Sequence, residues 1–318
     1  MHKALGPLLL FVAGSAWAQS YPSKPIRFVI PQTPGGQVDT VGRTVAQHLH
    51  ERLGQPVVIE NRAGANGAIG SDAVAKAAPD GHTLLMSSQS GLVFNAVTRK
   101  SLPFDPVQDF ASVTMLFDTP YYLIVHPSVP AKSVQELIAL ARSQPGKLNF
   151  GTVGIGSGQH LFTETFKART RIDIVHVPYK GSTQVGTDIL AGQIQLMLQG
   201  SGFTVPQAKT GKIRVLASTG AKRTLAMPEV PTLGEAGLPG YTAATWYGLA
   251  GPAKLPRPIV DRLNREVGEI LRLASMRDKY DPQDIVLSAS TPEELTERVR
   301  TEIPMFAKAM KDAGVEPE

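Results

Sequence analysis

The segment 151–160, GTVGIGSGQH, has the composition of a loop that binds an anion. It follows an apolar run, and a helical pattern begins at His160. Glycine allows backbone N–H groups to turn toward one point, and the N-terminus of the following helix adds partial positive charge. Thr152 and Ser157 add hydroxyl donors. A tight turn that needs glycine only for its dihedral angles would have the same composition, so this segment alone leaves both interpretations open.

Three well-known glycine motifs do not fit this segment. The dinucleotide fingerprint fails because Gln159 occupies the third glycine position. A P-loop fails because no Gly-Lys-Ser or Gly-Lys-Thr closes the loop. A nucleophile elbow fails because Ile155 stands where its first glycine would be. The segment therefore indicates neither a nucleotide nor a serine nucleophile.

A second segment, 31–39 (PQTPGGQVD), repeats the arrangement of strand, glycine and helix. It follows the apolar run 26–30 and offers Thr33 together with the paired Gly35 and Gly36. Open α/β sheets bind ligands outside the carboxyl ends of their strands. Two such junctions on two lobes can face each other across a cleft, and this pairing favours an anion site over two unrelated turns.

Alternating apolar runs and helical patterns supply the elements that position these loops. We expect strands at 26–30, 57–60, 83–87, 148–152, 172–177, 194–198 and 213–219. We expect helices at 38–54, 68–78, 133–146, 160–170, 185–193, 256–274 and 291–314. Strands that alternate with helices at this spacing predict βαβ units, parallel sheets and an α/β fold.

The length of 318 residues predicts about two domains. Proline-rich turns at 126–133 and 227–241 suggest where the chain enters and leaves a second lobe. We therefore expect a discontinuous lobe A of residues 19–123 and 241–318, and a lobe B of residues 124–240. The two C-terminal helices are expected to pack on lobe A.

The N-terminus has the pattern of a secretory signal peptide. Lys3 precedes the apolar run 8–12, and Ala16-Trp17-Ala18 forms a small-x-small ending. We expect cleavage after Ala18 and a periplasmic protein. The sequence has no cysteine, which excludes disulfides, thiolate metal sites, a cysteine nucleophile and a lipid-modified cysteine. The net charge of +5 is scattered along the chain, so no footprint for nucleic acid is expected.

Four segments closely resemble one family of transport proteins. They are YPSKPIRFVIPQTPGGQVDTVGR, NRAGANGAIGSDAVAKAAPDGHTLLMSS, HVPYKGS and WYGLAGPA. In this order they resemble the periplasmic solute-binding receptors of tripartite tricarboxylate transporters, the TctC or Bordetella-uptake family. The resemblance implies a two-lobed periplasmic-binding-protein (Venus flytrap) fold with a ligand cleft between the lobes. It also implies that the loops at 31–39 and 151–160 grip a ligand carboxylate, and that the receptor hands its solute to membrane permease subunits.

The expected ligand contacts lie in these two loops and in the turns that follow other strands. They are Gln32, Thr33, Gly35, Gly36, Asp39, Ser88, Ser90, Asn95, Thr152, Gly156, Ser157, Gly158, His160, Lys180, Gly181 and Ser182. For Asp39, helix capping and ligand contact are both open, and His160 is either a ligand contact or a residue that stabilises the cap. Gln32 and Gln199 depart from the family pattern, and these departures bear on which carboxylate binds.

Two other functions are consistent with the sequence. One is a ligand-sensing protein that feeds a sensor kinase through the same fold. The other is a periplasmic hydrolase, but no motif joins a nucleophile, a base and an orienting group. We expect no enzymatic activity, no catalytic residue, no cofactor, no metal and no nucleic-acid partner, and a monomer that binds a small carboxylate.

Overall fold

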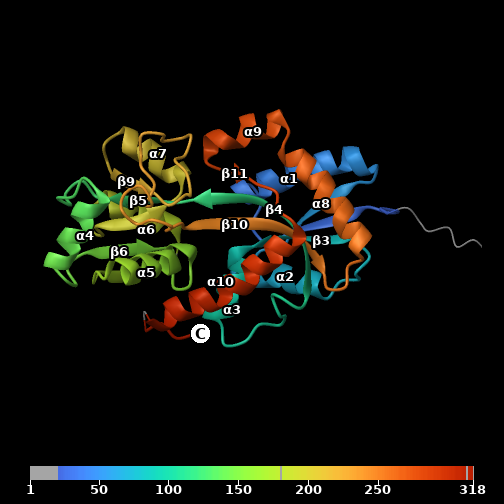
Figure 1. The fold of residues 1–318 in the computed structure, drawn as a ribbon, viewed down its shortest axis with the longest axis horizontal. Coiled ribbons are helices and arrows are strands. Elements are labelled where there is room, and N and C mark those ends of the chain that lie inside the picture. Colours follow the sequence, from blue (N-terminus) through green and yellow to red (C-terminus); the bar gives the residue numbers. More distant parts are fainter. Residues whose placement is uncertain (1–20, 180, 313, 318) are drawn as a thin grey trace, which may run out of the picture.

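The computed structural model describes residues 21–179, 181–312 and 314–317. The predicted signal peptide and Lys180 lie outside these residues. The strands are β1 (Ile26–Ile30), β2 (Val57–Asn61), β3 (Thr83–Ser88), β4 (Phe110–Pro120), β5 (Tyr122–Val125), β6 (Asn149–Thr152), β7 (Val175–Pro178), β8 (Leu196–Gln199), β9 (Arg214–Ser218), β10 (Ala244–Pro252) and β11 (Val286–Leu287). They form two sheets: sheet A, with the order β11-β4-β10-β3-β1-β2, and sheet B, with the order β7-β6-β8-β5-β9 (Figure 1).

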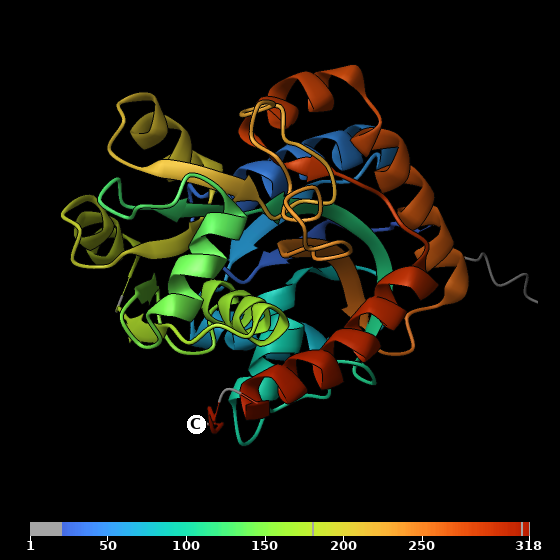
Figure 2. The same cartoon turned by 60° about the vertical axis from the view of Figure 1, so that its left-hand side comes forward.

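Helices flank both sheets. They are α1 (Gln37–Leu53), α2 (Ala68–Ala75), α3 (Asn95–Thr98), α4 (Val134–Ser143), α5 (Gly158–Thr170), α6 (Ser182–Leu190), α7 (Ser201–Lys209), α8 (Arg257–Leu271), α9 (Ala274–Tyr280) and α10 (Pro292–Asp312). Short helical turns occupy Ala65–Gly67, Ser90–Phe94 and Asp281–Gln283. The last helix, α10, packs on β4 of sheet A and also contacts α5 beside sheet B (Figure 2).

Local sequence explains most of these elements. In α1 the apolar residues predicted to share one face are all buried; they are Val38, Val41, Val45, Leu49 and Leu53. The helix ends at Gly54, whose φ of 70° is a left-handed conformation that glycine adopts without strain. Ser157 caps α5 because its side chain accepts a hydrogen bond from the His160 N–H.

The sheets are mixed, which corrects the expectation of parallel sheets. β1 pairs in parallel with β2 and β3, and β6 pairs in parallel with β7 and β8, as βαβ units require. However, β10 runs antiparallel to both β3 and β4, and β5 runs antiparallel to both β8 and β9. The strands β4, β5, β10 and β11 were not predicted from the sequence. β4 and β10 carry the chain out to sheet B and back again, so they necessarily run in opposite directions.

The two passages between the sheets are hydrogen-bonded to each other. The Thr219 N–H donates to the Tyr121 carbonyl at 2.8 Å, and the Tyr121 N–H donates to Thr219 Oγ1 at 2.8 Å. The Ala243 N–H donates to the Thr219 carbonyl at 2.9 Å. The connection between the two sheets is therefore a narrow pair of strands.

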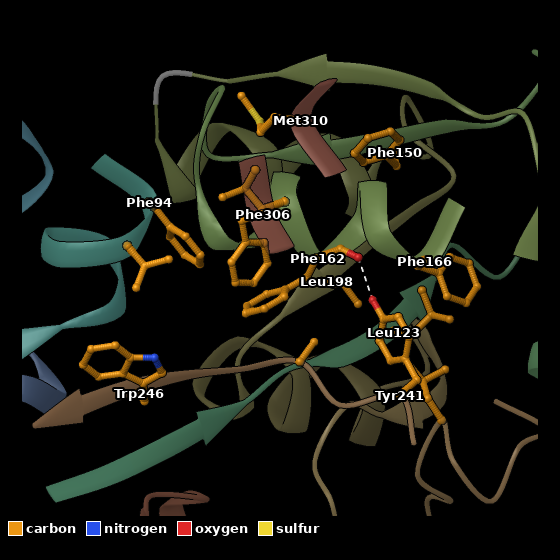
Figure 3. Packing of buried hydrophobic residues seen from close by; sticks show 14 of the residues in the cluster. Phe94, Leu123, Phe150, Phe162, Phe166, Leu198, Tyr241, Trp246, Phe306 and Met310 are labelled. Atoms are coloured by element: carbon orange, nitrogen blue, oxygen red, sulfur yellow. Dashed lines mark hydrogen bonds between the residues drawn. The ribbon is translucent and has the colours of Figure 1, made fainter. Parts of the chain in front are cut away.

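A cluster of aromatic side chains fills the space between α10, α5 and the segment before α3 (Figure 3). The rings of Phe94, Phe162 and Phe306 meet edge to face, with centroid separations of 5.1 to 5.9 Å. The Tyr241 hydroxyl donates to the Phe162 carbonyl at 2.6 Å. Trp246 is fully buried nearby and donates from Nε1 to Glu302 Oε2 at 2.7 Å. This packing joins the C-terminal helix to parts of both sheets.

Candidate functional site

A cavity of about 300 Å³ lies at the carboxyl ends of β1 and β3. The residues that line it are Pro31, Gln32, Thr33, Gly64, Asn66, Gly67, Ser88 and Ser90. Four predicted site residues, Gln32, Thr33, Ser88 and Ser90, therefore share one wall. The strand ends and glycine turns of sheet A bring them together from distant parts of the chain.

A second cavity, of about 240 Å³, lies between the two sheets. Sheet A and its crossover strands contribute Gln37, Thr119, Pro120, Tyr121, Tyr247, Gln283 and Asp284 to its wall. Sheet B and its helices contribute Val153, Gly158, Gln159, Gln199, Gly200 and Ser201. Of the predicted contacts only Gly158 lines this cavity. Gln37, Tyr121, Gln159, Tyr247 and Asp284 were missed, and only Gln199 carried a signal, as a departure from the family pattern.

The two cavities adjoin and together form the cleft. Ser88 of the first cavity faces Tyr247 of the second in the β3–β10 ladder. Burial raises the pKa of Tyr247 to about 12, and a hydrogen bond with the Gln32 side chain partly offsets this rise. The Tyr247 hydroxyl is therefore protonated and neutral at the boundary of the two cavities.

Three helices begin at the cavity between the sheets: α1 at Gln37, α5 at Gly158, and α7 at Ser201 after its N-cap Gly200. Within residues 21–179 and 181–312, the backbone N–H groups of Gln37, Gly158 and Gln159 find no acceptor. Unpaired N–H groups and the helix dipole make such N-termini favourable for an anion. Among the described residues, no lysine or arginine lines either cavity. An anion here would be bound by N–H and hydroxyl groups.

The glycine loop of sheet B is held in shape by its own side chains. The Gly156 N–H donates to His160 Nδ1 at 3.1 Å, and Ser157 Oγ donates to the Gly154 carbonyl at 2.7 Å. Thr152 Oγ1 lies 2.7 Å from His176 Nε2. Thr152, Gly156 and Ser157 were predicted as ligand contacts, and His160 as either a ligand contact or a residue that stabilises the cap. In the structure the Gly156 N–H, Ser157 Oγ and His160 Nδ1 bond within the loop, Thr152 Oγ1 contacts His176 of β7, and Gly158 lines the cavity.

Behind this loop lies a stacked pair of histidines, of which His160 is buried and His176 is half-buried. The rings of His160 and His176 stack with centroids 4.0 Å apart, and His160 is 1% exposed. Burial lowers the pKa of His160 to about 3 and that of His176 to about 4. Glu164 Oε1 lies 3.9 Å from His160 Nε2, and burial raises the pKa of Glu164 while Lys167, at 2.8 Å, opposes the rise. Both imidazoles are therefore neutral near pH 7.

Asp39 braces the glycine loop of sheet A. Its carboxylate, 3% exposed, accepts hydrogen bonds from the Gly35 N–H at 3.0 Å, Arg43 Nε at 2.9 Å and Asn61 Nδ2 at 2.9 Å. The hydrogen bond from Arg43 is the main cause that lowers the pKa of Asp39 to about 2. Gly35 has a φ of 87°, while Gly36 has a φ of −78° and caps α1. Both Asp39 oxygens are thus already engaged by the protein.

Asn95 has a similar bracing position behind the first cavity. Its Nδ2 donates to the carbonyls of Ala65 and Asn66 at 3.3 and 3.1 Å. Gly181 precedes α6 and Ser182 begins it, and Gly181 lines neither cavity as described.

In the described part of the chain, no group of histidine and acidic side chains is arranged to hold a metal ion. None of the helices described there is long and apolar enough to span a bilayer.

Two α/β sheets joined by crossover strands, with helix N-termini around the cleft between them, define a periplasmic binding protein. R. palustris Rpa4515, solved with adipate, has this fold: it is 35% identical, with a TM-score of 0.78 over 94% of this chain and 100% of that one. The chain belongs to the tripartite tricarboxylate transporter family of receptors, whose model matches residues 41–317. The predicted family and fold are confirmed.

Two further relatives agree with this assignment. The protein BugT of Bordetella pertussis is 34% identical over 304 residues, which are 95% of this chain and 93% of BugT. MatC from Rhodopseudomonas palustris, solved with bound malate, is 29% identical, with a TM-score of 0.73 over 91% of this chain and 99% of MatC. The chain is therefore a periplasmic solute-binding receptor and not an enzyme.

Proposed function

We propose that this receptor captures a small carboxylate in the cleft and delivers it to the membrane permease subunits of a tripartite tricarboxylate-type transporter. The observation that carries the proposal is that α1 and α5 begin at opposite sides of one cavity, with N–H groups free of protein acceptors. The adipate and malate held by two relatives support the same ligand class.

The number of available donors is adequate for such a ligand. Hydrogen bonds to a charged group contribute about 1.5–3 kcal/mol each, so four would contribute roughly 6–12 kcal/mol before the cost of association. Micromolar binding requires about 8 kcal/mol. Backbone N–H groups of two helices, assisted by hydroxyls such as that of Tyr247, come close to this value.

We also propose that residues 19–123 with 241–318, and residues 124–240, are two lobes that close on the ligand about the crossover strands. The two helix N-termini belong to different lobes, so one carboxylate bridging them would favour the closed state. The mature protein starts at Gln19 after cleavage behind Ala18, and acts in the periplasm as a monomer. Small-angle scattering should show a smaller radius of gyration at ligand saturation, and an unchanged radius would count against closure.

The carboxylate site can be tested at the first residue of α1. Proline at this position removes one N–H and suits the helix, and Gly36, with φ −78° and ψ 172°, has the extended conformation that precedes proline. We expect Gln37→Pro to weaken carboxylate binding about 10- to 100-fold in isothermal titration, the loss of one charge-assisted hydrogen bond. Gln37→Ala, which keeps the N–H, is the matched control. Equal affinities in the two variants would contradict the proposed role of this helix.

A further inference from the structure

The wall of the cleft on sheet B is built from amide side chains whose orientation is fixed. Gln199 Oε1 accepts hydrogen bonds from the Gly200 N–H at 3.0 Å and from Gln159 Nε2 at 3.3 Å. Gln159 Oε1 in turn accepts from the Val153 N–H at 3.0 Å. Both amide oxygens are thus engaged by the protein. Within the described residues Gln199 Nε2 has no acceptor, and Gln199 lines the cavity. Its amide can therefore donate to a ligand.

At the neighbouring N-terminus of α7, the side chain of the first helical residue is bonded to the segment before β11. Ser201 Oγ donates to the Gln283 carbonyl at 2.9 Å, which brings Asp284 to the cavity wall. Asp284 is 4% exposed, and its carboxylate accepts from the Tyr122 hydroxyl at 2.5 Å and from the Ala226 N–H at 3.2 Å. Among the described residues, no lysine or arginine forms an ion pair with it within 4.0 Å, although Arg277 and Arg298 share a neighbouring cavity with it. A buried carboxylate without an ion-pair partner in the described part of the chain therefore lies on the α7 side of the cavity.

Because of this distribution of charge, the two sides of the cavity favour different chemical groups at the two ends of a ligand. The N-termini of α1 and α5 favour one carboxylate. A second carboxylate against the α7 side would meet the charge of Asp284 without a compensating cation, and like charges repel strongly where water is excluded. A carboxamide meets no such penalty, because its oxygen can accept from Gln199 Nε2 and its NH₂ can donate.

We propose that the ligand of this receptor is a monoanion, with one carboxylate at α1 and α5 and an uncharged carboxamide-type group against Gln159, Gln199 and Asp284. This inference rests on the proposed capture of a carboxylate. It separates this receptor from its relatives solved with adipate and malate, because both of those ligands carry two carboxylates. Gln199 and Asp284 are the residues that determine this specificity.

Matched pairs of ligands test the inference directly. Succinate, glutarate and adipate are each compared with the monoamide of the same acid by isothermal titration at about pH 7, where the second carboxylate is ionised. We expect the tightest-binding monoamide to bind with an affinity at least about tenfold higher than that of its dicarboxylate. Equal or tighter binding of the dicarboxylates would overturn the inference and leave carboxylate capture standing. Failure of every member of every pair to bind would contradict both.

Two substitutions test whether Asp284 and Gln199 cause the preference for a monoamide over a dicarboxylate. Asp284→Asn keeps an acceptor for the Tyr122 hydroxyl and removes the charge. We therefore expect the dicarboxylate to bind more tightly, so that the ratio of its Kd to that of the monoamide falls below about threefold. Gln199→Glu adds a negative charge and should weaken dicarboxylate binding further, which raises the ratio of the two Kd values. This variant tests the inference if Asp284→Asn does not fold. Asp281→Asn is the control, because Asp281 is in the same segment but does not line the cavity between the sheets. An unchanged ratio in the folded Asp284 and Gln199 variants would overturn the inference.

Discussion

The backbone N–H of Gly156 donates to Nδ1 of His160 at 3.1 Å, and this bond places the imidazole proton on Nε2. The glycine loop and the stacked histidine pair are therefore one structural unit. A doubly protonated His160 has no acceptor to offer, so protonation would release Gly156 and disturb the loop that presents Gly158 to the cleft.

The histidine pair predicts that stability falls as the solution becomes acidic. An unfolded histidine has a pKa near 6.5, whereas the folded values are about 3 for His160 and about 4 for His176. Between the folded and unfolded values only the unfolded chain takes up these protons, so the free energy of unfolding decreases as pH falls below about 6.5. Each histidine contributes a slope of at most about 1.4 kcal/mol per pH unit. Urea titrations at about pH 7 and 5.5 measure it.

His160→Asn should make this slope shallower, because the asparagine Oδ1 can still accept from Gly156 but does not titrate in this range. His50→Asn, at an exposed position of α1, is the control and should retain the slope of the parent protein. If both variants lose stability on acidification as steeply as the parent, His160 is not the cause.

Removing the Asp39 carboxylate should destabilise the glycine loop of sheet A. Asp39→Ala removes the acceptor of the Gly35 N–H and of Arg43 Nε, and one of the two acceptors of Asn61 Nδ2, which still donates to the Gln32 carbonyl. The loss should cost about 1–3 kcal/mol of unfolding free energy. Since the folded pKa is depressed to about 2, the charged carboxylate contributes stability above about pH 4, and this is lost as pH falls through about 2. Chemical denaturation measures the change. The exposed pair Lys308–Asp312 supplies the control, because Asp312→Ala should have an effect below about 1 kcal/mol.

The two loop glycines should respond differently to alanine. Gly156 has a φ of 72°, and a Cβ there would lie 2.6 Å from Thr98 Cγ2. Gly156→Ala should therefore lower stability by at least about 1 kcal/mol. Gly36 has an ordinary φ, and a Cβ there meets no atom within 4 Å, so Gly36→Ala should stay within about 0.5 kcal/mol of the parent. Thermal melting compares the two.

A second substitution separates the two causes at Gly156. Thr98→Ser removes Cγ2 but keeps the hydroxyl that donates to the Phe94 carbonyl at 2.8 Å. Added to Gly156→Ala, it should restore the part of the stability lost to the clash and leave the part lost to the left-handed backbone. Identical melting of the single and double variants would show that the contact with Thr98 is unimportant.

Glu302 should be the polar residue of α10 that matters most to folding. Its Oε2 accepts from Trp246 Nε1 at 2.7 Å and from Gln89 Nε2 at 2.8 Å. Glu302→Ala leaves two buried donors unsatisfied and should cost about 2–4 kcal/mol in denaturant unfolding. Glu302→Gln keeps an acceptor and should recover much of this loss. Glu297→Ala, on the exposed side of α10, should change stability by less than about 1 kcal/mol.

The sequence by itself determined the elements whose signals are local. The spacing of Val38, Val41 and Val45 defined the buried face of α1, and glycines after the strands at 26–30 and 148–152 marked the glycine loops before α1 and α5. These features follow from helix periodicity and from the conformational freedom of glycine, which depend on near neighbours only. Four ordered segments were also specific enough to identify the family.

Only the tertiary structure decided what faces the cleft. Gln37, Tyr247 and Asp284 carry no local signal, because each becomes a wall residue through contacts with segments far away in the sequence. The antiparallel β4 and β10 exist as a pair because the chain must return from sheet B, which no local pattern records. The same is true of Asp39 and His160, whose roles depend on which partners occupy their polar atoms. Side-chain type is written in the sequence, but burial and hydrogen-bond partners are set by packing between elements, and these decide which donors remain for a ligand.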